Sequence, residues 1–321
     1  KRNYLAMRAH NHANQKLILG PWGHTDTSDR TAKNRDFGRE ATLDLQREYV
    51  RWFDYWLKGI NNHIMDEPLV SMFTMGSNEW HTGNSYPLEA TRFTKLYLAG
   101  KGNANSGLGN GLLSWEPSTQ ETEFDSYRYD PNDPTPDPTF YLPDHRGDSS
   151  APPPSAQEEK EEERAYHNRV VNTRKDILVY RTPPLKEPLT LCGPVSAKIY
   201  ASSSAGDTDW FVSLSEETDT EEVFPLVCGK IRARYRTSMF KPELLEKGRI
   251  YEYDLDLWHT GITIPAGRRI RIEIASALFP MFSRNLNTGG NNEMETESRV
   301  AEQKVYHCSA YPSHILLPVL P

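Results

Sequence analysis

A histidine follows a short apolar segment near the start of the sequence. Residues 17–19 are Leu-Ile-Leu and run into Gly20-Pro21 and then Gly23, so they predict a short buried strand ending at a loop that presents His24. Catalytic side chains often lie in loops at strand ends, so His24 is the first candidate for a catalytic role. The alternative interpretation is a histidine in an ordinary β-turn.

Two other patterns contain residue types that bind metal ions. His10 and His12 are two positions apart, but no acidic or sulfur ligand follows at a useful spacing. Asp207 and Asp209 lie beside Trp210 and could supply two of the roughly six to eight oxygens that calcium needs. Such carboxylates more often cap a turn. We therefore expect no metal and no cofactor.

The elements that follow His24 predict a helix and then a second buried strand. Residues 39–58 have an apolar stripe at helical spacing, which predicts core packing, and Lys58-Gly59 supplies a stop signal. The stripe consists of Leu45, Tyr49, Trp52, Phe53, Trp56 and Leu57. Residues 69–75 read as another strand. The order of these elements is strand, histidine-bearing loop, helix and strand, which is found at the C-terminal side of an open α/β sheet. The other strands of such a sheet would lie upstream or in a partner chain.

From about residue 92 the sequence alternates with period two, which is typical of strands. In the predicted strand 268–276, for example, Ile270, Ile272 and Ile274 alternate with the charged residues Arg269, Arg271 and Glu273. The other predicted strands are 94–98, 123–129, 177–180, 195–202, 210–214, 231–236, 251–257 and 314–319. Short strands separated by Gly, Pro and Asn turns predict a two-sheet antiparallel sandwich or jelly roll. The proline-spaced segment 130–138 and a charged, solvated insertion at 148–164 interrupt this pattern.

Composition limits the classes of partner. The 321 residues carry a net charge of -7 at pH 7, which argues against nucleic acid and anionic membranes, because both require a basic surface. No apolar run is long enough to span a membrane. Cys192, Cys228 and Cys308 are widely spaced within apolar segments and read as buried thiols, although a single disulfide stays open. A small-molecule substrate fits these limits.

Eight motifs in register resemble one enzyme family. They are Gly20-Pro-Trp-Gly-His24, Trp52-Phe-Asp-Tyr-Trp-Leu-Lys-Gly59, Gly76-Ser-Asn-Glu-Trp80, Tyr129-Asp-Pro-Asn-Asp-Pro134, Asp207-Thr-Asp-Trp210, Ile231-Arg-Ala-Arg-Tyr-Arg236, Phe279-Pro280 with Arg284-Asn-Leu-Asn-Thr-Gly289, and Pro312-Ser-His-Ile-Leu-Leu-Pro318. Together they resemble the CocE/NonD hydrolases, a family that includes cocaine esterase, glutaryl acylases, α-amino-acid ester hydrolases and X-Pro dipeptidyl peptidases.

The resemblance implies a mainly β chain. Residues 1–91 would be the last strands and helix of an α/β-hydrolase domain, and residues 92–321 a galactose-binding-like jelly-roll sandwich with an insertion at about 145–168. His24 would be the base of a Ser-His-Asp triad, taking a proton from serine and returning it to the leaving alcohol or amine. Phe140 and Tyr141 would contribute to an apolar wall of the acyl pocket. The substrate would be a small ester or amide, or an X-Pro peptide.

The rest of the triad is not found in the sequence. No serine lies in a Gly-x-Ser-x-Gly elbow, and residues 1–17 contain no acidic residue. We therefore expect this chain alone to be inactive and to associate with an upstream part or with further copies of itself. A second function class stays open, in which the sandwich is a non-catalytic module that binds carbohydrate or a protein partner.

Overall fold

The structure is a computed structural model, and it describes residues 2–10, 14–23, 27–32, 35–105, 107, 109–137, 158, 161, 166, 170–220 and 222–321. The helices are α1 (Arg2–Ala9), α2 (Leu45–Lys58) and the short 3-10 helices η1 (Arg39–Ala41) and η4 (Ala233–Tyr235). The first strands are β1 (Leu17–Leu19), β2 (Thr31–Ala32), β3 (Arg35–Asp36), β4 (Val70–Thr74) and β5 (Glu79–Gly83). The remaining strands are β6 (Arg92–Ala99), β7 (Gly111–Ser114), β8 (Phe124–Tyr129), β9 (Leu178–Arg181), β10 (Leu189–Ser203), β11 (Asp209–Glu217), β12 (Val223–Arg232), β13 (Tyr251–Ile264), β14 (Arg269–Ala275), β15 (Ala301–Tyr306) and β16 (His314–Leu320).

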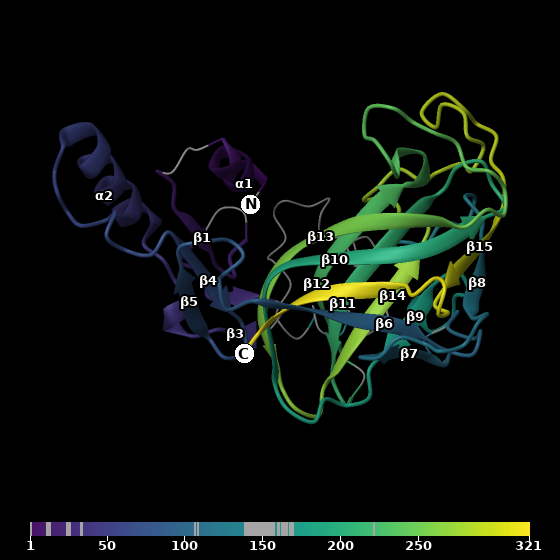
Figure 1. Ribbon diagram of the computed structural model, residues 1–321, viewed down its shortest axis with the longest axis horizontal. Coiled ribbons are helices and arrows are strands. Elements are labelled where there is room, and N and C mark those ends of the chain that lie inside the picture. The colour runs from purple at the N-terminus through teal and green to yellow at the C-terminus, as the bar shows by residue number, and fades with distance from the viewer. Residues whose placement is uncertain are drawn as a thin grey trace.

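The described strands from β6 onward form a β-sandwich, as the period-two pattern predicts. Their order is β12-β11-β14-β9-β7-β6-β16-β10-β15-β8, with β13 paired to β10. These strands lie in two facing layers in Figure 1. Fully buried side chains fill the space between the layers, among them Trp210, Tyr253, Leu96 and Ile199. The prediction of a mainly β chain is therefore confirmed.

Strand β14 shows how the alternation is used. Ile270, Ile272 and Ile274 point into the main core, as their spacing predicts. The opposite face of the strand is also covered, because Arg271 is buried there beside a small second apolar cluster. That cluster consists of Tyr166, Val170, Val171, Ile177, Val179 and Ala275. A buried arginine needs paired charges, and Glu217 and Glu273 provide them.

A separate three-stranded sheet precedes the sandwich. Strand β1 pairs with β4 in parallel, with Leu17 opposite Val70, and β5 pairs with β4 in antiparallel register. Helix α2 lies between β1 and β4 in the sequence, so the three elements form a β-α-β unit. The residue after β4 joins this sheet to the sandwich, because Met75 exchanges two backbone hydrogen bonds with Gly261 and Thr263 of β13.

Helix α2 is shorter and far more exposed than the sequence predicts. Residues 39–41 form η1, and α2 begins only after Asp44, whose side chain accepts a hydrogen bond from the backbone N–H of Arg47. It ends at Gly59, which has a φ of 70°, so the predicted stop is confirmed. The predicted core packing is wrong. No residue of α2 is buried, and Tyr49, Phe53, Trp56 and Leu57 are 57%, 51%, 40% and 76% exposed.

This exposure has a plain physical cause. In Figure 1, α2 projects from the left end of the molecule, away from the sandwich, and no further layer of described residues covers its outer side. An amphipathic stripe reports that a helix face is apolar, but it does not report what lies opposite. Helix α2 therefore presents an uncovered apolar face.

Several shorter elements were not predicted. Residues 2–9 form α1, a helix that the sequence pattern does not predict, and β5, β7 and β15 lack a clear apolar alternation. The predicted strand 231–236 is displaced, because β12 ends at Arg232 and residues 233–235 form η4. The two-residue strands β2 and β3 pair only with each other. No helix of the described residues is long and apolar enough to cross a membrane.

Candidate functional site

His24 lies just outside the described residues, and the residues on either side of it are held in place. The indole Nε1 of Trp22 donates a hydrogen bond of 2.6 Å to the carbonyl of Ala41. On the other side, Thr27 exchanges bonds with Leu43, because its hydroxyl donates to the Leu43 carbonyl at 2.7 Å and its own carbonyl accepts from the Leu43 N–H at 2.8 Å. Both described ends of the loop are thus fixed to the segment that links η1 to α2.

A stack of aromatic rings connects this loop to the sandwich. The rings of Trp22 and Trp80 lie 5.8 Å apart, and Trp80 meets Phe73 edge-on at 5.3 Å. Trp80 also donates from its indole Nε1 to the carbonyl of Glu40 at 2.7 Å. Phe73 belongs to the main core of the sandwich. The turn before His24 is therefore positioned by side chains that continue into that core.

Gly20 is required by the way this turn folds back. A Cβ atom on Gly20 would lie 2.5 Å from the ring of Trp22, which is closer than any carbon contact allows. Glycine lets the indole lie directly over the backbone at the end of β1. Because β1 and β4 are parallel, the loop that carries His24 follows the carboxyl end of a parallel strand, which is where open α/β sheets place their ligands.

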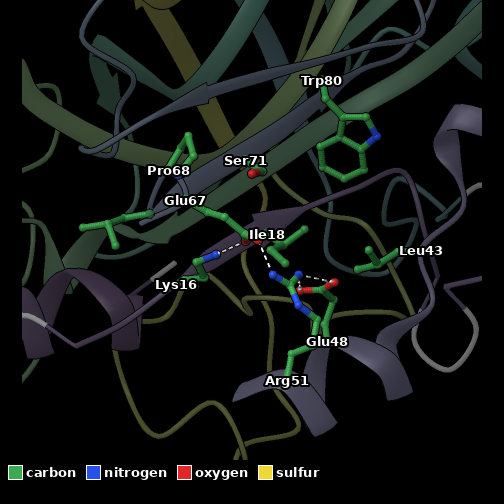
Figure 2. A pocket seen from close by; sticks show the side chains of 10 residues that line it. Lys16, Ile18, Leu43, Glu48, Arg51, Glu67, Pro68, Ser71 and Trp80 are labelled. Carbon is green, nitrogen blue, oxygen red and sulfur yellow. Dashed lines mark hydrogen bonds and ion pairs between the residues drawn. The ribbon is translucent and has the colours of Figure 1, made fainter. Parts of the chain in front are cut away.

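A hollow of about 270 Å³ opens on one face of the three-stranded sheet (Figure 2). Figure 2 shows Lys16, before β1, and Arg51, from α2, converging on Glu67, which lies before β4. Arg51 also bonds Glu48 at 3.1 Å. Burial is the largest influence on Glu67 and raises its pKa, but the bonds from Lys16 and Arg51 together lower the pKa below its ordinary value.

The charged side chains that line this hollow pair with one another, and their role is structural. Two cations meet two carboxylates, and the other lining residues are mostly apolar, with Ile18, Leu43 and Trp80 among them. The lining includes no histidine or cysteine, and its one serine, Ser71, has no base beside it in the lining. The ion pairs tie α2 to the starts of β1 and β4, so they orient the β-α-β unit that contains the His24 loop.

The two predicted pocket residues, Phe140 and Tyr141, lie outside the described residues, so their role stays a prediction. The same holds for most of the insertion at 145–168. His12 is likewise outside the described residues, and His10 is exposed at the end of α1. Among the residues that the structure describes, no group of three His, Cys, Asp or Glu side chains could hold a metal ion.

Calcium binding by Asp207 and Asp209 is contradicted, because arginines already neutralise both buried carboxylates. Arg234 bonds Asp207 at 2.8 Å, Arg232 bonds Asp209 at 3.0 Å, and the Asn285 amide donates to both carboxylates at 2.8 Å. Asp207 also accepts the backbone N–H of Arg234, a bond across 27 residues, so the contacts of these carboxylates are long-range and do not cap a local turn. Burial raises the pKa of Asp209, and its bonds to Arg232 only partly offset this.

This buried cluster unites three of the eight sequence motifs. Residues 207–210, 231–236 and 284–289 are far apart in the sequence and meet around these two carboxylates. Sequence analysis did not pair them, because alternation predicts strands and gives no information on which distant polar residues face each other. The motifs are explained by buried ion pairing within the sandwich.

Comparison with known proteins agrees with this architecture. The sequence profile of the X-Pro dipeptidyl-peptidase C-terminal non-catalytic domain matches residues 62–316, which is most of the chain. The chain belongs to this family. It is also 35% identical to the cocaine esterase of Rhodococcus sp. (strain MB1 Bresler), over 99% of this chain and 53% of that protein. The resemblance to the CocE/NonD hydrolases is confirmed.

Two solved structures share both fold and sequence with this member of the family. An aminopeptidase from a marine sediment archaeon, Thaumarchaeota archaeon, superposes with a TM-score of 0.80 at 26% identity, over 99% of this chain and 52% of that one. An α-amino acid ester hydrolase superposes with a TM-score of 0.76 at 26% identity, over 98% and 52%. The chain spans about half the length of these relatives. His24 precedes the range that the family profile matches.

Proposed function

We propose that this chain is the C-terminal part of a serine acyl hydrolase that cleaves esters, amides or X-Pro peptides, and that His24 is its triad base. The observation that carries the proposal is the parallel β1-α2-β4 unit, with the Gly20-to-His24 turn at the carboxyl end of β1. In this role the imidazole accepts the serine proton during attack and returns it to the leaving alcohol or amine. The jelly-roll connectivity of the sandwich and an α/β-hydrolase origin for residues 1–91 are parts of this proposal.

The nucleophile and the acid come from upstream sequence in this proposal. The uncovered face of α2 and the short edge strand β1 support it, because an α/β-hydrolase sheet continues beyond one terminal parallel pair and covers its helices. The relatives are about twice as long as this chain, so they have sequence enough for such a domain. The sandwich then acts by holding the His24 loop through Phe73, Trp80 and Trp22.

The proposal is tested on two proteins, the 321-residue chain and a version extended upstream to the length of its relatives. We expect a fluorophosphonate probe to label a serine in the extended protein and none in the chain alone. His24→Gln in the extended protein should lower p-nitrophenyl butyrate hydrolysis by about 10⁴-fold or more, with an unchanged melting temperature. His63→Gln is the matched control, because the His63 ring is exposed and forms an ion pair with the exposed side chain of Asp66.

Two results would overturn the proposal. One is serine labelling of the chain alone, which would place a nucleophile within residues 1–321. The other is a His24→Gln variant of the extended protein that keeps more than about a tenth of its activity, because removal of a triad base costs far more than that. The extended protein failing to hydrolyse esters, anilides and X-Pro peptides alike would count against the reaction class itself.

A further inference from the structure

Four aromatic side chains lie in contact with one another on the outer face of the sandwich, with neighbouring ring planes tilted by 51°, 59° and 53°, and we call them the aromatic shelf. Phe124 on β8, Tyr306 on β15 and Tyr200 on β10 lie directly opposite one another in the strand register. Tyr311, from the loop between β15 and β16, lies against two of them. Successive ring centroids are 5.6 Å apart for Phe124–Tyr306, 5.8 Å for Tyr306–Tyr311 and 5.6 Å for Tyr200–Tyr311.

Strand alternation directs the shelf to solvent. The residues next to it in the three strands, Asp125, Ile199 and Val305, are buried in the interior, so their neighbours face outward. Phe124 is 38% exposed and Tyr311 is 36% exposed. Tyr200 and Tyr306 are half-buried because the rings beside them cover part of their surface.

The loop that carries Tyr311 is held in place without any ligand. The hydroxyl of Ser313 accepts a bond of 2.9 Å from the backbone N–H of Tyr200 and also bonds the carbonyl of Tyr306 at 2.5 Å. The backbone N–H of Tyr311 donates to the carbonyl of Cys308 at 3.1 Å. A preformed aromatic surface loses little conformational entropy when it binds.

Polar groups of both signs border the shelf. The ammonium group of Lys304 lies 4.6 Å from the centre of the Phe124 ring. At the other end, Glu252 bonds both Tyr200 and Lys198, and Lys198 also bonds Asp254 at 3.0 Å. Two lysines and two carboxylates give this border no net charge. It therefore favours an uncharged ligand with many hydroxyl groups over an anion or a cation.

From these features we infer that the aromatic shelf binds a neutral polysaccharide chain. A pyranose ring has an apolar C–H face that stacks on aromatic rings and a rim of hydroxyl groups that bonds charged side chains. The site is independent of His24 and of the proposed acyl transfer.

The position of the shelf leaves it open in a longer protein. Figure 1 shows β8 and β15 at the right end of the sandwich, whereas β1, β4 and β5 lie at the left. The upstream domain that we propose would extend the sheet at the left end. A polysaccharide on the shelf would then hold the enzyme at a glycan surface and leave the His24 loop free.

The experiment is native affinity electrophoresis of the 321-residue chain in gels that contain hydroxyethylcellulose, arabinoxylan, galactomannan or glycogen. We expect at least one of these neutral polymers to retard the chain. Tyr311→Ala should weaken that binding about tenfold, because it removes one stacking ring, and Tyr311→Phe should retain most of it. Phe124→Ala is the second test variant. Phe240→Ala is the matched control, because Phe240 is 98% exposed and lies outside the shelf.

Melting temperatures of all variants establish that each one folds. Retardation by none of the four polymers would overturn the inference, and so would equal binding by Tyr311→Ala and the parent chain. A shelf that joins two copies would show as a dimer in sedimentation that Tyr311→Ala dissociates, and this too would overturn it. Polymer binding that the 321-residue chain shows and the extended protein lacks would overturn the inference that the shelf stays open in the longer protein. Hydrolase activity has no bearing on any of these outcomes.

Discussion

The buried ion pair between Arg271 and Glu217 allows the most direct test of how the sandwich is stabilised. Both side chains are almost fully buried, and their atoms lie 2.7 Å apart. Arg271 also bonds Glu273 at 2.7 Å, and Arg181 bonds Glu217 at 2.8 Å. Glu217→Gln replaces the carboxylate by an amide of the same shape, so the packing is kept. Arg271 and Arg181 then lose the negative charge that they share.

The expected cost is about 3 kcal/mol of unfolding free energy at pH 7. Removing one member of a buried pair typically costs about 3 to 5 kcal/mol, and the lower end applies because Glu273 still pairs with Arg271. For a domain of this size that loss corresponds to a melting temperature lower by about 6 to 12 °C. Thermal and urea unfolding followed by tryptophan fluorescence measure it, since Trp210 is fully buried in the main core of the same sandwich.

The pH dependence gives an independent check. Burial is the largest influence on Glu217 and raises its pKa, but Arg271 and Arg181 together outweigh burial and hold the pKa below its ordinary value of 4.5. A carboxyl group with a lowered folded pKa stabilises the protein above its unfolded pKa, and this stability disappears as the pH falls through the folded pKa. The difference between the parent protein and Glu217→Gln should therefore be full at pH 7 and shrink below about pH 4.5.

Two controls make the result specific. Glu246→Gln removes an exposed carboxylate that pairs with the exposed Arg249, so it should not measurably change stability. The double variant Arg271→Met with Glu217→Met should recover part of the loss, because it removes one charge of each sign, although Arg181 and Glu273 each lose a partner. A loss below about 1 kcal/mol for Glu217→Gln, or a loss that is constant from pH 7 to pH 3, would refute the reasoning.

Three further predictions concern other parts of the chain. Burial raises the pKa of Cys192 to about 11, so at pH 8 it should resist iodoacetamide until urea unfolds the protein, and rapid native alkylation in mass spectra would contradict this. Trp80→Phe should lower the free energy of unfolding in urea by about 1 kcal/mol, because it loses the hydrogen bond to the Glu40 carbonyl. Trp80→Ala should lower it further, because the ring contact with Phe73 is also lost. Equal stability of the parent protein and both variants would argue against the aromatic stack. Phe53→Ser with Leu57→Ser should reduce self-association in light scattering without lowering the melting temperature, whereas clear destabilisation would mean that the α2 face is covered.

The sequence predicted the sandwich well because alternation is a local signal. Ile270, Ile272 and Ile274 identify β14 and its buried face from seven consecutive residues. Strand β15 was missed because its inward residues include Gln303, which is buried and bonds Thr208 and Ser276. A buried polar residue breaks the apolar pattern, and only its distant partners explain it.

The sequence predicted the existence and the C-terminal stop of helix α2 correctly, and its N-terminus and surroundings wrongly. Gly59 is a local signal that located the stop, whereas the predicted start at residue 39 missed the Asp44 cap and the separate helix η1. The aromatic stripe predicts an apolar face, but burial depends on what other chain segments supply. The shelf was hidden for a similar reason: Phe124, Tyr200 and Tyr306 are far apart in sequence, and only strand register places them side by side.

The structure also explains why the family could be recognised although most of the triad is not found in this chain. The motifs at 207–210, 231–236 and 284–289 contribute to one buried ionic cluster, so their spacing reflects the sandwich and not the chemistry. The link to chemistry is mechanical. Phe73 packs in the sandwich core, and Trp80 packs on Phe73. Trp22, which lies two residues before His24 in the sequence, packs on Trp80. A domain that performs no catalysis can therefore still set where the proposed base lies, and loosening this stack should lower the activity of an extended protein before it unfolds the sandwich.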